Sequence, residues 1–91
     1  MVTPDGVRFT LTNAAATSVS VTGNFNEWSA AANPLARSGK VWTAVVALPP
    51  GEHLFTFIVD GKAMVPPLAE DFADDGFGSR NGVVIVRPRE R

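Results

Sequence analysis

Short runs that alternate apolar and polar residues constrain the fold of this chain more than any other feature. Residues 7–12 read Val-Arg-Phe-Thr-Leu-Thr, and residues 18–22 read Ser-Val-Ser-Val-Thr. A period of two residues places the apolar side chains on one face of a strand, so both runs predict half-buried strands. The side chains expected to point inward from these runs are Val7, Phe9, Leu11, Val19 and Val21.

Later runs extend the same pattern. β-branched and aromatic residues dominate residues 41–48 and 53–59, and turn-forming residues flank each run, which favours strands over helices. Residues 62–65 and 83–86 predict two shorter strands, and residues 68–81 are expected to form a long loop between them. The expected inward side chains are Leu35, Trp42, Ala44, Val46, Leu48, His53, Phe55, Phe57 and Val59.

Turn signals separate these runs. Asp60-Gly61 stands between two apolar runs and favours a two-residue type I′ hairpin. Pro49-Pro50 forces a turn, because proline cannot donate a hydrogen bond to a strand ladder. Six or seven short strands without a helical period predict an all-β, immunoglobulin-like β-sandwich. The chain has no cysteine, so packing alone must hold the two sheets together.

Composition limits the classes of function. Ninety-one residues predict one domain over residues 1–91, with a core from 7 to 87 and a tail or linker from 88 to 91. The net charge of -1 argues against a nucleic-acid partner, which would require a basic face. No apolar run approaches the roughly 20 residues of a membrane span, so no membrane partner is expected. No signal peptide is visible, and a cytoplasmic location is expected. A longer parent protein could still carry a signal peptide or a membrane span.

The loop from Gly23 to Trp28 is polar and turn-forming, yet it carries two large aromatic rings. Phe25 is interpreted as an anchor beneath the loop. Trp28 has two interpretations: an exposed ring that stacks on a sugar, or a loop tryptophan folded onto the core. The first is favoured, because binding residues collect on loops that a rigid scaffold positions.

Several ordered motifs resemble a known family. They are Val-Ser-Val-Thr-Gly-Asn-Phe-Asn-Glu-Trp at 19–28, Pro-Leu at 34–35, Leu-Pro-Pro-Gly-Glu-His at 48–53, Phe-Ile-Val-Asp-Gly at 57–61 and Asp-Asp-Gly-Phe-Gly with Asn81 at 74–81. Together they resemble the family 48 carbohydrate-binding modules, which include the glycogen-binding domain of the AMP-activated protein kinase beta subunit and the N-terminal domains of isoamylases. The resemblance implies an early-set immunoglobulin-like sandwich that binds α-1,4-glucan without catalysis and without a cofactor or metal.

The resemblance also implies roles for particular residues. Trp28 would stack on a glucose ring, and the amide of Asn81 would hydrogen-bond sugar hydroxyls. Ser79 stands where glycogen-binding members often have a small hydroxyl residue, and Phe77 where an apolar side chain supports the sugar. From the residues alone, Asn81 has a second interpretation as a turn residue before Gly82.

Two positions depart from the family pattern. Ala63 stands where a second stacking tryptophan is usual, and Thr56 where a lysine reaches the sugar hydroxyls. With one ring the expected affinity is millimolar at best, or about -4 kcal/mol. The alternative is a structural or protein-interaction module that has kept the sandwich and lost the sugar.

The acidic group Glu70, Asp71, Asp74 and Asp75 permits three interpretations. Clustered carboxylates can bind calcium, but the spacing lacks the pattern of an EF-hand loop. A glycosidase acid/base pair needs two carboxylates about 5 to 10 Å apart across a cleft, and a small sandwich offers no obvious cleft. A solvated loop is favoured, and Arg87, Arg89 and Arg91 are likewise interpreted as a solvated chain end.

Some apolar side chains fall on the outward face of the runs at 41–48 and 53–59. If these two strands are neighbours, the side chains form a contiguous patch, which suggests contact with another domain or a second copy. The residues of this predicted patch are Val45, Ala47, Leu54 and Ile58.

Overall fold

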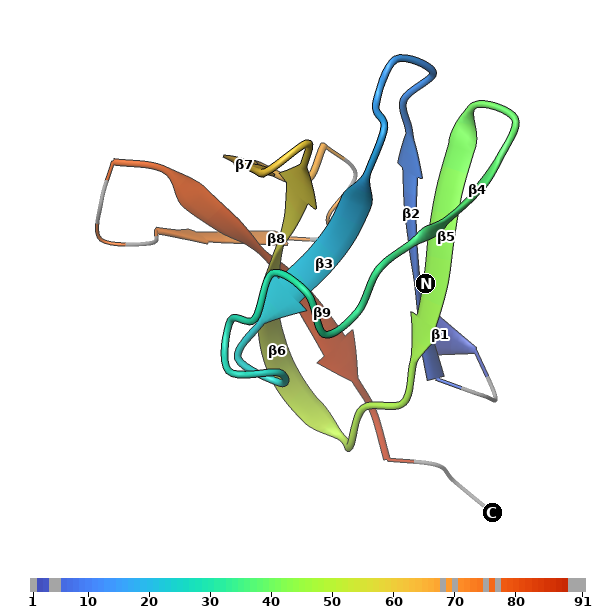
Figure 1. Cartoon of the computed structure of the whole chain (residues 1–91). Helices are drawn as coiled ribbons and strands as arrows, with labels where there is room; N and C mark the ends of the chain where they lie inside the picture. Colours follow the sequence, from blue (N-terminus) through green and yellow to red (C-terminus); the bar gives the residue numbers. More distant parts are fainter. Residues whose placement is uncertain are drawn as a thin grey trace.

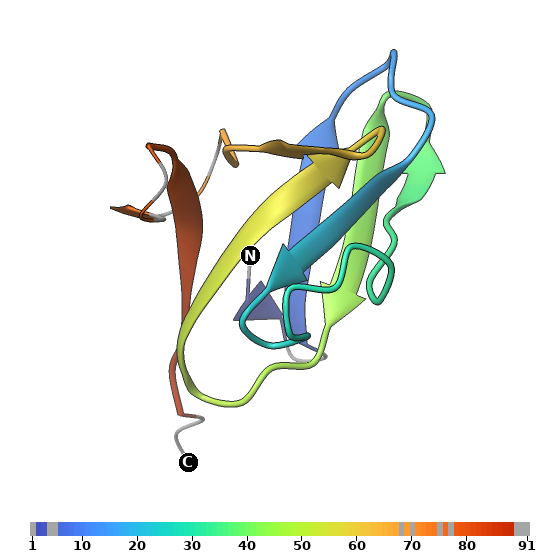
Figure 2. The ribbon, with the colours of Figure 1, turned by 60° about the vertical axis from the view of Figure 1, so that its left-hand side comes forward.

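The computed structural model describes residues 2–3, 6–67, 69, 71–74, 76 and 78–88 of the chain. They form two antiparallel sheets that face each other (Figures 1 and 2). The first sheet has the order β1 (Val2–Thr3), β2 (Gly6–Thr12), β5 (Val41–Val46), β4 (Ala36–Ser38). The second has the order β3 (Val19–Gly23), β6 (Gly51–Val59), β9 (Arg80–Val86), β8 (Asp71–Asp74), and β7 (Lys62–Met64) also pairs with β6. The predicted all-β sandwich is therefore confirmed, and no helix in the described ranges is long and apolar enough to cross a membrane.

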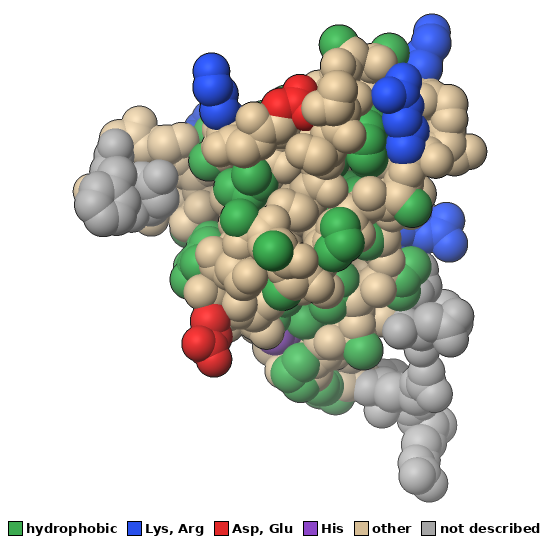
Figure 3. All heavy atoms as spheres, in the orientation of Figure 1, with side chains coloured by type: hydrophobic (Ala, Val, Ile, Leu, Met, Phe, Trp, Pro, Cys, Tyr) green, Lys and Arg blue, Asp and Glu red, His purple; other side chains and the backbone are tan. Residues whose placement is uncertain are grey.

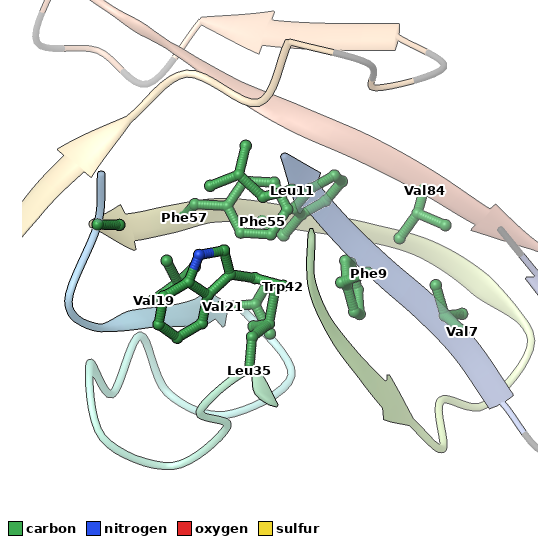
Figure 4. Close-up of a cluster of buried hydrophobic side chains, with 11 residues drawn as sticks. Val7, Phe9, Leu11, Val19, Val21, Leu35, Trp42, Phe55, Phe57 and Val84 are labelled. Carbon is green, nitrogen blue, oxygen red and sulfur yellow. The ribbon is translucent and has the colours of Figure 1, made fainter. Parts of the chain in front are cut away.

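The core lies between the two sheets and is built from the predicted inward faces (Figure 4). Phe55 packs edge-on against both Phe9 and Phe57, with ring centroids 4.9 and 5.8 Å away. The indole of Trp42 is buried, and its Nε1 donates a hydrogen bond to the backbone oxygen of Asn13 at 2.9 Å. Burial is confirmed for the inward residues Val7, Phe9, Leu11, Val19, Val21, Leu35, Trp42, His53, Phe55 and Phe57, whereas Ala44, Val46, Leu48 and Val59 are half-buried against the same cluster.

The hairpin at Asp60-Gly61 is confirmed. Both residues have positive φ, 50° and 84°, as a type I′ turn requires, and Val59 pairs with Lys62 on either side. The carboxylate of Asp60 also reaches across to the segment before β3. Its Oδ1 accepts hydrogen bonds from Thr17 Oγ1 and Thr17 N, both at 2.8 Å, and from Ser18 N at 2.9 Å. The bond from Thr17 Oγ1 and the two backbone donors lower the pKa of Asp60.

The predicted loop over residues 68–81 is wrong in part. Asp71–Asp74 forms β8, which pairs with a β9 that begins at Arg80 rather than at Val83. Asp, Ala and Gly are depleted in strands, so the sequence of this hairpin carries a weak strand signal. Pairing with β9 stabilises β8 despite this weak propensity. In the pair, Phe72 lies opposite Gly82 and Asp74 lies opposite Arg80.

The predicted outward apolar patch is also wrong. β5 belongs to the first sheet and β6 to the second, so the two strands are not neighbours. Val45 is 46% exposed on the first sheet, whereas Leu54 and Ile58 are half-buried on the second, and Ala47 lies beyond the end of β5. The connection through Pro49-Pro50 takes the chain from β5 in the first sheet to β6 in the second. On the face that Figure 3 presents, hydrophobic side chains are interspersed with other atoms.

Candidate functional site

The loop that follows β3 is held by the side chain of Asn26. Its Oδ1 accepts a hydrogen bond from the backbone N–H of Gly23 at 3.0 Å. Its Nδ2 donates to the backbone oxygen of Val21 at 3.2 Å and to Oδ1 of Asn33 at 2.8 Å. One amide therefore ties the loop to β3, which precedes it, and to the segment that follows.

The start of this loop lies directly against β6. The backbone N–H of Asn24 donates to the backbone oxygen of Leu54 at 3.1 Å, and the Leu54 N–H donates to Asn24 Oδ1 at 3.2 Å. A Cβ at Gly23 would collide with that same backbone oxygen of Leu54 and with the ring of Phe25. Glycine is required at position 23 because the two backbones approach too closely for any side chain.

Phe25 is the predicted anchor beneath the loop, and the structure confirms it. Its ring stacks on Phe9 with centroids 5.8 Å apart and planes 19° apart, and it meets His53 nearly edge-on at 6.4 Å. His53 is itself buried, with Nε2 2.8 Å from the backbone oxygen of Pro49, which agrees with its expected inward position.

Trp28 ends the loop in an uncommon backbone conformation. Glu27 and Trp28 have φ values of 57° and 58°, in the left-handed region that costs a non-glycine residue about 1–3 kcal/mol. The backbone N–H of Trp28 donates to the Gly23 oxygen at 2.9 Å, which closes the loop on itself. The Trp28 side chain is 43% exposed, so it is not the core-packed tryptophan of the alternative interpretation.

A shallow hollow of about 740 Å³ lies beside Trp28 on the second sheet. The loop contributes Trp28, β6 contributes Leu54 and Thr56, β7 contributes Ala63, and the start of β9 contributes Asn81. The full described lining is Trp28, Leu54, Thr56, Ala63, Met64, Val65, Asp74, Ser79, Arg80 and Asn81.

The hollow collects residues that are far apart in the sequence. Trp28, Ser79 and Asn81 line it together, whereas Phe77, the fourth predicted site residue, lies outside the described residues. Asn81 is an internal residue of β9 opposite Ala73, so its interpretation as a turn residue is wrong. A half-exposed indole and a carboxamide thus share one surface depression.

The two positions that depart from the family pattern also line the hollow. Thr56 is buried, and its hydroxyl donates to the backbone oxygen of Met64 at 2.6 Å, so its proton is already committed. Ala63 is exposed and contributes only a methyl group. Among the described lining residues, Trp28 is therefore the single aromatic side chain.

Several lining residues are not predicted as site residues by the sequence pattern. Leu54 was assigned to an outward apolar patch, although its position two residues before Thr56 on β6 places both on the face of the hollow. Arg80 received no role, yet it lines the hollow between Ser79 and Asn81. Its position in the Ser-Arg-Asn run was the only available signal.

The acidic residues show no metal centre in the part of the chain that is described. Asp74 Oδ1 accepts a hydrogen bond from the backbone N–H of Gly76 at 2.8 Å, as in a turn. Asp71 is exposed, and Glu70 and Asp75 lie outside the described residues.

Comparison with known proteins gives a consistent result. Residues 7–91 match the family model described as the glycogen recognition site of AMP-activated protein kinase. Over 69 residues, 76% of this chain, the sequence is 36% identical to 5'-AMP-activated protein kinase subunit beta-1 of Sus scrofa and of Homo sapiens. It is 35% identical to subunit beta-2 of Mus musculus over the same length. The matches cover 54%, 24% and 25% of these relatives, so the chain corresponds to only part of each.

Proposed function

The chain belongs to the family of the glycogen recognition site of AMP-activated protein kinase, and we propose that it is a non-catalytic module that binds α-1,4-glucan. The glucan class includes glycogen, starch and maltooligosaccharides. The observation that carries the proposal is that exposed Trp28 shares one hollow with Ser79 and Asn81.

The chemistry of a glucose ring fits these side chains. A pyranose has an apolar face of C–H groups, which the flat indole of Trp28 covers, and a rim of hydroxyl groups. The amide of Asn81 offers both donors and an acceptor to that rim, and the hydroxyl of Ser79 adds a further donor and acceptor. The fixed loop geometry supports the same role, because a pre-positioned ring loses little conformational freedom on binding.

The proposed affinity is low. One aromatic ring and a few exposed hydrogen bonds correspond to a millimolar dissociation constant, or about -4 kcal/mol. A neutral glucan releases no counterions, so binding of unsubstituted glucan should vary little with salt.

The experiment is a titration with maltoheptaose followed by backbone amide chemical shifts, together with co-sedimentation on glycogen. Shifts are expected at Trp28, Ser79 and Asn81, and Trp28→Ala should abolish both signals. Val45→Ala removes an exposed apolar side chain from the other sheet and serves as the matched control. Equal recovery of wild type and Trp28→Ala on glycogen would remove Trp28 from the proposed site.

A structural or protein-interaction module is the second candidate. Thr56 and Ala63 favour it, because these two described lining residues stand where the family pattern has a lysine and a second tryptophan. If this candidate is correct, no amide chemical shift should change at any glucan concentration, so the maltoheptaose titration distinguishes the two functions.

A further inference from the structure

Arg80 is a charged side chain at the glucan hollow to which the proposed binding of neutral sugar assigns no role. It is exposed at the first position of β9, next to Ser79 and one residue before Asn81. Its guanidinium carbon lies 4.8 Å from the centre of the Phe72 ring on β8. This cation–π contact restrains the arginine at the rim, because a ring face attracts a guanidinium within about 6 Å.

Within the part of the chain that the structure describes, one other charged side chain lines the hollow beside Arg80. Asp74 is the only carboxylate among the described lining residues, and it lies opposite Arg80 in the β8–β9 pair. No ion pair between them falls within the described contacts, and Asp74 Oδ1 instead accepts the Gly76 backbone N–H. The remaining described lining side chains are uncharged.

We propose that Arg80 binds a phosphate monoester carried by the glucan, so that this module prefers phosphorylated over unsubstituted α-glucan. The inference rests on the proposed function, since Trp28 and Asn81 would still hold the sugar. A guanidinium offers a planar set of N–H donors that matches two phosphate oxygens, and the doubly charged group strengthens both hydrogen bonds. A neutral hydroxyl at the same position can also accept a hydrogen bond from the guanidinium, but it carries no negative charge that would strengthen that bond.

The experiment uses the whole chain and one dextrin preparation in two forms, phosphorylated and treated with phosphatase. Amide chemical shifts give the dissociation constant of each form. At low salt, the wild type is expected to bind the phosphorylated form about threefold to tenfold more tightly. The preference should shrink as salt rises from about 0.02 M to about 0.5 M, because exposed charges are screened over shorter distances.

Variants assign the preference to the arginine. Arg80→Gln should bind both forms equally, and Arg80→Lys should retain part of the preference because the charge remains. Asp74→Asn should increase the preference, since it removes a negative charge beside the phosphate. Lys40→Gln removes a cation from the turn before β5, in the other sheet, and should change nothing. Thermal midpoints check that each variant is folded.

The outcomes separate this inference from the function on which it rests. Equal binding of both dextrins by wild type, or a preference that survives in Arg80→Gln, overturns the role of Arg80 and leaves glucan binding intact. Failure of both dextrins to bind overturns the proposed function and this inference with it. Inorganic phosphate alone should cause little shift, and saturation by phosphate without sugar would show a general anion site and also overturn the inference.

Discussion

The ring of Phe25 lies nearly parallel to that of Phe9, with centroids 5.8 Å apart and planes 19° apart. Phe9 belongs to β2 in the first sheet, whereas Phe25 belongs to the loop that carries Trp28 beside the second sheet. This stack ties the candidate binding loop to the core across both layers. We therefore expect the position of the exposed indole to depend on this contact beneath the loop as well as on the hydrogen bonds within the loop.

Phe25→Ala is expected to weaken both stability and glucan binding. The ring is half-buried, so its loss should lower the free energy of unfolding by about 2 kcal/mol, below the 3–5 kcal/mol typical of a fully buried phenylalanine. Urea denaturation measures the first effect and maltoheptaose titration the second. Phe25→Leu keeps an apolar anchor and should recover most of the stability, and full glucan binding by Phe25→Ala would contradict the dependence of Trp28 on this anchor.

Gly23→Ala should destabilise the protein more than an alanine at an open glycine. A Cβ at Gly23 would meet the backbone oxygen of Leu54, which cannot rotate away, so a loss of about 3 kcal/mol or more is expected. Gly39→Ala is the matched control, because nothing lies within 4 Å and only its positive φ of 62° opposes alanine, at about 1 kcal/mol. Urea midpoints that are equal for the two variants would contradict the close approach.

The period of the sequence predicted the strands and the inward faces well, because burial on one side of a sheet dictates alternation. The Asp60-Gly61 turn was equally readable, since few residue pairs tolerate two positive φ values. The sequence does not predict in the same way which strands belong to which sheet. From the sequence, residues 41–48 and 53–59 are expected to be neighbouring strands, and only the packing shows that the chain changes sheets between them.

The sequence predicts only part of the candidate site, because the rest depends on contacts between segments that are distant in the sequence. The motif at 19–28 singles out Trp28, but it does not predict the positive φ of Glu27 and Trp28. It also does not predict that Asn26 accepts a hydrogen bond from the Gly23 N–H and donates one to the Val21 oxygen. The place of Arg80 at the site is not predictable from the sequence, because its partner Phe72 lies on β8, a strand whose residues have weak strand propensity. The role of a residue that depends on a neighbour in another strand can be predicted only when the register between the two strands is known.

Asp60 should make stability depend on pH in the acid range. Hydrogen bonds from Thr17 and Ser18 stabilise its charged form, so its pKa in the folded protein lies below the ordinary value of 3.8. The unfolded protein then binds a proton more readily, and the contribution of Asp60 is complete above about pH 4 and is lost as pH falls through the folded pKa. Asp60→Asn retains an oxygen acceptor and tolerates positive φ, but it removes the charge.

Urea unfolding from pH 6 to pH 2 tests this linkage. Relative to Asp60→Asn, the wild type should be more stable at pH 6, and the difference should shrink steadily below pH 4. Asp71→Asn, an exposed residue of β8, is the control for a general change in net charge. Parallel stability curves for wild type and Asp60→Asn would show that the hydrogen bonds to Asp60 contribute nothing through its charge.

Ala63→Trp should strengthen glucan binding, because Ala63 is exposed on β7 and lines the same hollow as Trp28. A second ring that stacks on a neighbouring glucose is worth about 1 kcal/mol, which corresponds to a threefold to tenfold lower dissociation constant for maltoheptaose. Tryptophan also has a higher strand propensity than alanine, so the fold should tolerate the change. Ala36→Trp places the same ring on exposed β4, at the edge of the other sheet, and should leave binding unchanged. If folded Ala63→Trp binds no better than wild type, β7 does not present its side chains to the sugar that Trp28 covers, and the bound glucan must follow a different path across the second sheet.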